Sequence, residues 1–411
     1  MDILKKESGN MIFKTGIKEE EHIAFLKEKK VFPLNQSPLW RHIKDNWGCE
    51  FLGVYKDESE KELIASCMAL IRPLPMGFTM VYLSRGPVMD HTDKELVKFF
   101  CRNLRKWAKK KKCVFAKADP YVLYRKFRMG EEGTYNPEYD EIVAAYTEAG
   151  FKYGGLTEKM HETIQPRFHM TVFKEEFSEE NMTSKGKKNL KKAYKSNLDT
   201  RKTGIEGLED FSKVMQSTEK RQSVRLRDSD YYEKLLTIYG DDAFLMLTYI
   251  DIEKTYLTAK ARYEECVKGL EECPENAHKK RFKLEETLAS VSRDYKDFGE
   301  YLKKYGKETC VCGTLTVRFG GNAEVLYAGM NDEFKRYMAP YATWMKTFEE
   351  CFDNGVNTVN MGGVDGSLSD GLTQFKSSFS PEICEYMGEF DLPVMKLLYT
   401  PVKKLYLKMK R

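Results

Sequence analysis

The clearest hydrophobic pattern in the chain lies in residues 252–305. Apolar side chains recur there at alternating spacings of four and three residues, first in residues 252–270 and again in residues 284–302. A turn-forming run with Pro274 separates the two segments, and charged residues of both signs fill the intervening positions. Such heptads predict two helices that pair as an antiparallel hairpin and project into solvent. Two ordinary helices packed against a core are the alternative.

On either side of this hairpin, the pattern predicts a mixed α/β arrangement that occurs twice. In the first half, strands are expected at 63–71 and 79–83, a helix at 94–110 and a third strand at 113–117. In the second half, the same order is expected at 309–319, 323–327, 337–354 and 357–361. The matching order and spacing indicate a duplicated α/β unit, with the hairpin inserted into the second copy.

Two strands followed by a helix and a further strand also form the core of acyltransferases of the GNAT type. The glycine-rich turn that binds the pyrophosphate of coenzyme A in such enzymes is missing here. The candidate segment 84–88 places Pro87 where a backbone donor is needed. An acyltransferase with this fold is therefore expected to use a donor other than an acyl-coenzyme A.

Composition narrows the class of protein. At 411 residues the chain is expected to hold two or three domains of roughly 150 residues each. Its 41% hydrophobic and 13% aromatic residues exclude a disordered or fibrous protein. The longest apolar run, 244–250, is shorter than a membrane-spanning helix, and the first residues lack the apolar core of a secretory signal, so a soluble cytoplasmic protein is expected. The ten cysteines form no C-x-x-C pair and are expected to be reduced thiols, with no metal site and no cofactor.

The net charge of +5 is small, but the basic residues cluster. Residues 185–202 hold eight basic residues and one acid. On a helix, Leu190, Ala193, Tyr194 and Leu198 would share one face, and lysines would cover the rest. A second cluster lies near the hairpin tip, and both favour an extended polyanion such as tRNA, with a solvated helix face as the plain alternative. The basic residues of the two clusters are Lys187, Lys188, Lys191, Lys192 and Lys195, and Lys279, Lys280 and Arg281.

Two further basic segments are less informative about a binding partner. Residues 105–112 are expected to form the solvated end of a helix. The C-terminal segment 395–411 interleaves apolar and basic residues. It is suited to lying on an anionic membrane surface, and equally to forming a packed terminal helix with a basic rim.

Several short motifs follow one another along the chain in a recognisable order. They are NQSPLW at 35–40 with Trp47 after it, SRGPVMD at 84–90, ETIQPR at 162–167 after Gly150 and Phe151, and GKKNLKKA at 186–193. The most specific are GLTQFKSSF at 371–379 and EYMGEFDLP at 385–393. From about residue 12 to its C-terminus, the chain resembles the Fem peptidyltransferases, the family of FemA, FemB, FemX and MurM.

The resemblance implies a fold with two GNAT-like lobes of mixed α/β (α+β) structure and an inserted antiparallel coiled-coil arm, similar to that of seryl-tRNA synthetase. The first lobe would comprise residues 1–153 and about 386–411, the second residues 154–251 and 306–385, and the arm residues 252–305. Composition by itself predicts none of these boundaries.

The resemblance also implies an activity and its partners. The family transfers an amino acid from aminoacyl-tRNA to the stem-peptide amine of a peptidoglycan precursor, which builds the interpeptide bridge. Armless members use the soluble UDP-MurNAc-pentapeptide, whereas armed members are associated with the lipid-linked precursor, so the arm favours lipid II. A cytoplasmic location with peripheral contact at the inner face of the membrane is expected.

The chemistry is aminolysis of an activated ester, which needs positioning and stabilisation of developing negative charge but no covalent nucleophile. Lys376, within QFKSSF, falls on the family lysine linked to catalysis, and Lys44, four residues after Trp40, matches a position that binds the nucleotide-linked precursor. Arg221 or Arg225 lies where the family places a precursor-contacting arginine, and Tyr327 matches an aromatic that contacts the precursor. Without the resemblance, Lys376 would be predicted as a surface charge and Tyr327 as a core-facing strand residue.

The base that accepts the amine proton is less defined. Asp365 and Asp370, in the glycine-rich segment 362–371, are candidates, although Asp-Gly pairs are equally typical of turns. His161 and His169 are expected to be structural, because no Ser/His/Asp or Cys/His arrangement is found. Two other classes stay open: a non-catalytic tRNA-binding or RNA-binding protein, and a GNAT-like transferase that uses aminoacyl-tRNA with another amine acceptor.

Overall fold

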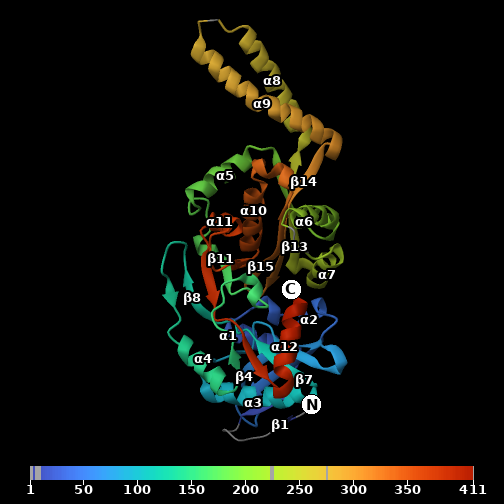
Figure 1. Ribbon diagram of the computed structural model, residues 1–411, viewed down its shortest axis with the longest axis vertical. Helices are drawn as coiled ribbons and strands as arrows, with labels where there is room; N and C mark the ends of the chain where they lie inside the picture. Colours follow the sequence, from blue (N-terminus) through green and yellow to red (C-terminus); the bar gives the residue numbers. More distant parts are fainter. Residues whose placement is uncertain (1–2, 5–10, 223–225, 275, 411) are drawn as a thin grey trace. The chain divides into compact units, whose positions relative to one another are not determined.

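The computed structural model describes the chain except residues 1–2, 5–10, 223–225, 275 and 411. By contacts between residues, the chain divides into two compact units (Figure 1). Unit 1 comprises Met1–Thr183, Val317–Glu324 and Asn354–Arg411, and unit 2 comprises Ser184–Thr316 and Val325–Asp353. The lobe boundaries implied by the family resemblance stay a prediction.

Unit 1 contains a mostly antiparallel sheet built on the first α/β repeat. Helix α3 (Lys94–Lys110) joins its parallel strands β5 and β7 and packs with α4 (Tyr139–Glu148) on the sheet. The apolar face of α3 buries Phe99, Phe100 and Trp107, which explains its regular hydrophobic spacing. The strand order is β1 (Ile3–Leu4), β2 (Ile12–Thr15), β3 (Gly48–Tyr55), β4 (Leu63–Pro73), β5 (Thr79–Leu83), β7 (Cys113–Ala118), β18 (Phe390–Pro393) and β10 (Lys152–Tyr153), with β6 (Val88–Met89) on β4.

A second group of strands in unit 1 supplies most of the candidate site. They pair antiparallel in the order β16 (Thr358–Val364), β11 (Phe168–Phe173), β17 (Glu382–Tyr386), β8 (Leu123–Phe127) and β9 (Thr134–Tyr135). Strand β16 also pairs in parallel with the first residues of β15 (Asn322–Met330), from Asn322↔Thr358 to Glu324↔Asn360. The other helices of unit 1 are α1 (Glu19–Lys29), α2 (Trp40–Ile43), α11 (Gly371–Ser377) and α12 (Lys396–Lys410).

Unit 2 contains strands in the order β12 (Leu198–Thr203), β13 (Ala243–Asp251), β14 (Glu308–Phe319) and β15, with the turn between β14 and β15 assigned to unit 1. Strands β12 and β13 pair antiparallel from Leu198↔Ile250 to Thr203↔Leu245. The helices are α5 (Ser184–Tyr194), α6 (Leu208–Gln222), α7 (Ser229–Tyr239), α8 (Ile252–Glu271), α9 (His278–Tyr305) and α10 (Ala339–Asp353).

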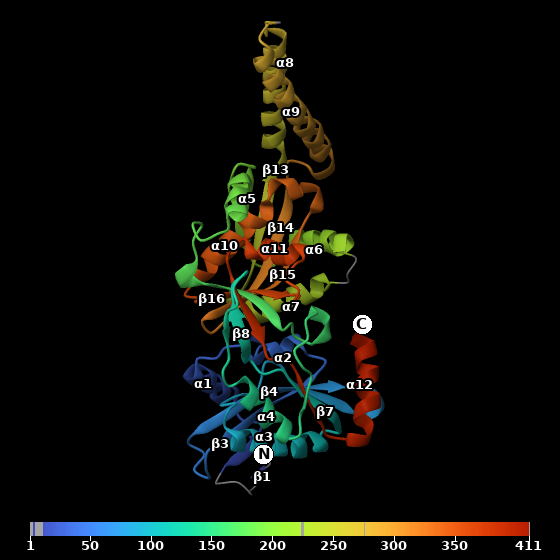
Figure 2. The same cartoon turned by 60° about the vertical axis from the view of Figure 1, so that its left-hand side comes forward.

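The predicted hairpin is present as α8 and α9, which lie side by side in both views (Figures 1 and 2). Tyr256 and Tyr263 stack on Tyr295, each with ring centroids 5.3 Å apart, so the heptad positions form the seam between the helices. At the base, Phe298 is 0% exposed and packs with Ile252 in a cluster of unit 2 that includes Val311, Phe334 and Tyr337. The base of the arm is therefore part of the core of unit 2.

The predicted repeat is also present, and the fold class is confirmed. The series β4, β5, α3, β7 recurs as β14, β15, α10, β16, and in each series the helix joins two strands that pair in parallel. The right twist of a strand feeding a right-handed helix favours such a crossover. Helix α3 has the predicted bounds, and α10 begins two residues later than expected.

Two segments differ from the sequence prediction or decide between its alternatives. The basic helix α5 ends at Tyr194, so Leu198 lies on β12 instead of the helix, because its backbone pairs with Ile250. The C-terminal segment is a packed helix: Tyr399 and Tyr406 of α12 contact Phe115 of β7, with ring centroids 5.8 and 6.1 Å away (Figure 2). Among the described residues, no helix combines the length and apolar character that a membrane crossing requires.

Candidate active site

Lys376, the lysine singled out by the sequence, lies on the short helix α11. The carboxylate of Asp370 caps this helix by accepting from the backbone N–H groups of Leu372 at 2.8 Å and Thr373 at 3.0 Å. Lys376 is only 4% exposed, and its Nζ donates to the carbonyl oxygen of Gly363 on β16 at 3.0 Å. Burial lowers the pKa of Lys376 to about 7, against the carboxylates of Asp370 and Glu324, which raise it. Lys376 is thus a buried amine that titrates near neutrality.

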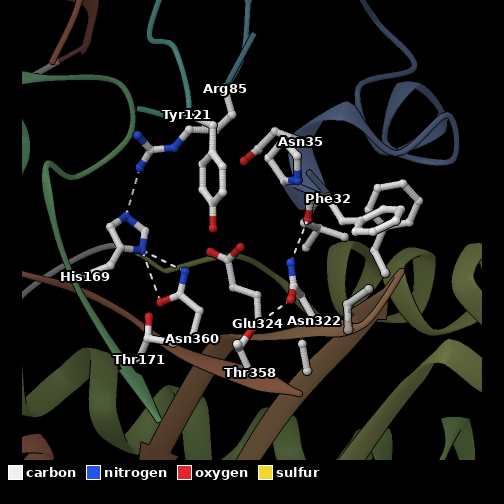
Figure 3. A pocket seen from close by; sticks show the side chains of 15 residues that line it. Phe32, Asn35, Arg85, Tyr121, His169, Thr171, Asn322, Glu324, Thr358 and Asn360 are labelled. Carbon is white, nitrogen blue, oxygen red and sulfur yellow. Dashed lines mark hydrogen bonds between the residues drawn. The ribbon is translucent and has the colours of Figure 1, made fainter. Parts of the chain in front are cut away.

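A small cavity in unit 1, of about 40 Å³, is lined by several polar groups, including the carboxylate of Glu324 that acts on Lys376 (Figure 3). Strand register brings three of them together: Glu324 of β15 is the partner of Asn360 on β16, and His169 of β11 is the partner of Gly363. The turn after β5 adds Arg85, and the segment before β8 adds Tyr121. Residues 32–35 also line the cavity.

Arg85 and His169 form a buried chain of polar contacts with Asn360. Arg85 is 4% exposed, and its Nη2 lies 3.0 Å from His169 Nε2 and 2.8 Å from the carbonyl oxygen of Pro166. His169 Nδ1 lies 3.1 Å from Asn360 Oδ1 (Figure 3). Burial and the charge of Arg85 lower the pKa of His169 to about 3, so this histidine is neutral near pH 7 and orients Arg85.

Arg85 is also held from its backbone. Its φ of 53° is left-handed, and its N–H donates to Asp119 Oδ1 at 2.7 Å, while the hydroxyl of Tyr82 donates to Asp119 Oδ2 at 2.8 Å. Burial raises the pKa of Asp119 to about 6, although Arg85 lowers it. The guanidinium lies 4.3 Å from the ring centroid of Tyr386. These contacts hold a cation at the cavity wall in a single orientation.

The two predicted base candidates are engaged in local backbone contacts. Asp370 is the N-cap of α11, and although burial opposes the change, hydrogen bonds from Thr373 and Leu372 lower its pKa. Asp365 Oδ1 accepts from the backbone N–H of Met160 at 2.7 Å. This geometry favours the turn and capping roles, and their assignment as base stays a prediction.

The predicted precursor-binding residues lie in different settings. Lys44 follows α2 and is half-buried, with Nζ 5.8 Å from the ring centroid of Trp40. In unit 2, Tyr327 packs on Tyr232 of α7, with ring centroids 5.0 Å apart. Arg221 on α6 has Nη1 3.6 Å from Asp332 Oδ1, and Arg225 lies outside the described residues.

The cation beside Tyr327 is Arg227, which sequence reasoning missed. Its guanidinium lies 4.9 Å from the ring centroid of Tyr231, and that ring is 6.1 Å from Tyr327. Burial raises the pKa of Tyr327, against the charge of Arg227, which lowers it. The only sequence signal was position, because Arg227 follows Arg225 by two residues.

The predicted tRNA-binding residues are all exposed, in unit 2. On α5, Leu190 and Ala193 are buried and the lysines face outward, with Lys195 just beyond the helix end. Lys279, Lys280 and Arg281 lie in the first turn of α9, at the end of the arm far from its buried base. Both clusters therefore present positive charge to solvent.

Comparisons with known proteins define the class and then the family. A tandem GNAT protein from the clavulanic acid biosynthesis pathway has a TM-score of 0.51 and 8% identity, covering 93% of this chain and 98% of that chain. The crystal structure of FemX has a TM-score of 0.71 and 22% identity, covering 96% of this chain and 100% of that chain. The protein thus has the fold of the GNAT class of acyltransferases.

The FemAB family matches residues 17–407, and the chain belongs to this family. The aminoacyltransferase FemA of Staphylococcus aureus is 27% identical over 414 residues, covering 95% of this chain and 98% of the relative. That of Staphylococcus epidermidis is 27% identical over 368 residues, covering 84% and 88%. The predicted Fem resemblance and the assignment as an aminoacyltransferase are confirmed, and the predicted role in cell-wall synthesis is confirmed at the level of the family.

Proposed function

We propose that this protein transfers an aminoacyl group from aminoacyl-tRNA to the stem-peptide amine of a peptidoglycan precursor, with lipid II as the acceptor, and so builds the interpeptide bridge. The observation that carries the proposal is the buried ammonium of Lys376 beside a small polar cavity, in a member of the FemAB family. A fixed cation in a site of low dielectric constant is suited to stabilising an oxyanion.

The reaction needs no covalent intermediate. The neutral amine of the acceptor attacks the ester carbonyl, a C–N bond forms, and the C–O bond to the tRNA ribose breaks. The proton lost by the attacking amine passes to the leaving ribose oxygen, directly or through water. Lys376 stabilises the negative charge on the carbonyl oxygen, and positioning of the two substrates supplies several further kcal/mol, on the order expected for intramolecular reactions.

The exposed basic groups of unit 2 support tRNA as the donor. The lysines of α5 and the basic first turn of α9 are separated along the chain but share one property, positive charge exposed to solvent. Contacts with phosphates depend on such charges and weaken as salt rises. The arm carries its cluster on about 20–28 residues of helix, which extends it by roughly 30–40 Å.

The Tyr327–Arg227 cluster supports a diphosphate-linked acceptor. A guanidinium presents two parallel N–H groups to phosphate oxygens, and its stacking on Tyr231 limits its motion. The neighbouring rings of Tyr232 and Tyr327 add a rigid apolar wall. This combination is suited to a precursor that joins a sugar to a diphosphate.

A membrane contact is supported by a surface of unit 1 that we call the Met76 patch. Met76 and Leu397 are 92% and 94% exposed, more than any other large apolar residue among those described. Backbone hydrogen bonds tie their segments together, from Thr79 to Lys112 at 3.1 Å and from Met395 to Val114 at 2.9 Å. The patch comprises Met76, Lys109, Lys110, Lys112, Lys396 and Leu397.

Exposed apolar side chains together with exposed lysines match an anionic bilayer, where the apolar groups enter the headgroup region and the lysines meet lipid phosphates. Along α12, Leu405 extends the exposed apolar face beyond the patch. Peripheral contact of this kind would place the enzyme where a lipid-linked precursor resides.

The test of the proposed function incubates the protein with individual charged tRNAs and either lipid II or UDP-MurNAc-pentapeptide, and mass spectrometry detects an added residue. Addition that requires Lys376 supports the proposal. Binding of tRNA without addition to either precursor under any charged tRNA would contradict it and favour a tRNA-binding protein. Addition to another amine in place of either precursor would favour a transferase with a different acceptor.

A further inference from the structure

The carboxylate of Glu324 stands apart from the other acids of unit 1. It lines the cavity, yet it makes no hydrogen bond or ion pair with any residue that the structure describes. The hydroxyl of Tyr121 points toward it across the cavity (Figure 3). Glu324 is half-buried, and carboxylates removed from water are normally paired or hydrogen-bonded. A carboxylate that faces a cavity without such a hydrogen bond therefore indicates a missing partner.

The two cations near the cavity have hydrogen-bond partners of their own. Arg85 Nη2 contacts Pro166 and His169, and Lys376 donates to Gly363. Burial raises the pKa of Glu324, against the charges of Arg85 and Lys376, which lower it. His169 is held neutral by burial and by Arg85, which lower its pKa. The unsatisfied group is therefore an acceptor with negative charge, and its natural complement is a cationic donor.

The cavity has room for a small polar group. A space of about 40 Å³ exceeds the ~10–15 Å³ that one water needs. An ammonium group can therefore enter it and meet the carboxylate of Glu324. Thr171 also lines the cavity and offers its hydroxyl oxygen to a small ammonium group.

We propose that Glu324 binds the α-ammonium group of the aminoacyl donor and so favours donors whose α-amine is unmodified. The inference rests on the proposed function, since it assigns the donor end of that reaction. α-Amino groups titrate at about 7.7–8.0, so a large share of the donor carries the ammonium near neutral pH. Glu324 would thereby place the ester carbonyl next to it within reach of the Lys376 charge.

The consequence is a preference for an amine over other substituents at the α-carbon. Alanyl and lactyl esters differ only in an α-amino or α-hydroxyl group, and N-acetylation removes the positive charge. Glu324 is expected to favour the alanyl ester over both. Leaving a buried carboxylate without its ammonium partner penalises the uncharged analogues.

The test compares 3′-alanylamido-3′-deoxyadenosine, which cannot be hydrolysed, with its lactyl and N-acetylalanyl counterparts in equilibrium binding to the full-length protein. The wild type is expected to bind the alanyl compound at least tenfold more tightly than either counterpart. Glu324→Gln, which has almost the same shape, is expected to bind all three within a factor of two to three. Glu382→Gln, a change on β17 at a carboxylate 3.6 Å from Lys126 and outside the cavity, is the matched control and should keep the preference.

A wild type without preference, or a Glu324→Gln variant that keeps it, would overturn the inference. So would loss of the preference in Glu382→Gln, because a general charge effect would then explain it. The transfer assay separates the two proposals. If the ammonium preference depends on Glu324 but no precursor is extended, the proposed acceptor is wrong and the donor site stands.

Discussion

The ammonium of Lys376 on α11 lies 3.0 Å from the carbonyl oxygen of Gly363 on β16, a residue thirteen positions earlier in the chain. Gly363 also lets Pro166 approach β16, because a Cβ at Gly363 would come within 2.5 Å of the ring of Pro166, whose carbonyl accepts from Arg85. One glycine thus allows the two cations of the site to be held by neighbouring backbone segments.

Lys376→Met is expected to lower the rate of aminoacyl transfer by about 10²–10³-fold, as loss of an oxyanion donor does. Transfer should fall as pH rises above about 7, because burial lowers the pKa of Lys376 to about 7 and its charge is then lost. Lys376→Arg keeps its charge, so the fall that begins near pH 7 should disappear from its pH profile, and only the fall from loss of the donor ammonium above about pH 8 should remain. The rate of single-turnover transfer, measured from pH 6 to 9, checks both variants. A Lys376→Arg profile identical to that of the wild type would contradict the assignment of Lys376 as the titrating cation.

Asp370→Asn is expected to keep most of the activity and Asp370→Ala to lose more, because asparagine caps a helix as well as aspartate does. Replacing the capping residue by alanine lowers the free energy of unfolding by roughly 0.5–2 kcal/mol and loosens the helix that carries Lys376. The melting temperature and the transfer rate of both variants separate this role from that of a base. Equal, severe losses in Asn and Ala variants with intact folding would instead identify Asp370 as the base.

Arg227→Ala is expected to raise KM for the precursor by roughly tenfold to a hundredfold, the value of a charge-assisted hydrogen bond. Arg221→Ala should change KM less, because its guanidinium already pairs with Asp332. Lys213→Ala on α6, where the lysine pairs with Glu209, controls for the loss of any positive charge nearby. A larger rise in KM for Arg221→Ala than for Arg227→Ala would favour Arg221, the residue predicted from the sequence.

Shortening the arm is expected to weaken tRNA binding by tenfold or more while both units stay folded. Replacing residues 264–291 by a short Gly-Ser turn removes the basic end but keeps Tyr256, Tyr295 and the buried Phe298 at the base. Deleting the whole arm would remove Phe298 and leave a cavity that lowers the free energy of unfolding by about 3–5 kcal/mol. Fluorescence anisotropy with labelled tRNA measures affinity, and thermal unfolding reports the fold.

A charge-reversed arm provides the matched control for that truncation. Lys279→Glu, Lys280→Glu and Arg281→Glu together retain the length of the arm, so a similar loss of affinity would assign the effect to charge. Unchanged tRNA affinity in both proteins would contradict the predicted role of the arm.

Met76→Ser combined with Leu397→Ser is expected to weaken binding to vesicles of equal phosphatidylglycerol and phosphatidylcholine by at least tenfold, since two exposed apolar side chains lose their burial. Replacing Lys109, Lys110 and Lys112 by glutamine should weaken it by about a hundredfold, at ~1 kcal/mol per lysine. Ile205→Ser changes an exposed apolar residue of unit 2 and should have no effect. Cosedimentation measures binding; equal binding by all proteins would exclude the patch.

The hydrophobic pattern along the chain was sufficient to predict the helical hairpin and the repeated α/β series. Both depend on local periodicity: heptads for α8 and α9, and alternation followed by an amphipathic helix for each α/β series. The basic run was interpreted correctly as a helix only up to Tyr194, because β12 begins where pairing with β13 overrides the helical pattern. Helix propensity is weak enough for such tertiary pairing to decide.

The candidate site was only partly accessible from the sequence. Lys376 came from a motif, but its burial, its lowered pKa and its bond to Gly363 have no local signal. Arg85, His169 and Glu324 are single polar residues in a turn or a strand, and nothing near them in the chain distinguishes them. Arg227 was missed for the same reason.

By itself, the sequence determined the elements, their repetition, the basic clusters and the family, because periodicity, composition and motifs are properties of neighbouring residues. Only the tertiary structure decided which charges share the cavity. Strand register places Glu324 beside Asn360 and His169 beside Gly363, and burial then shifts the pKa values of the groups around them. Those shifts depend on distance and dielectric environment between residues remote in the chain, which no local pattern records.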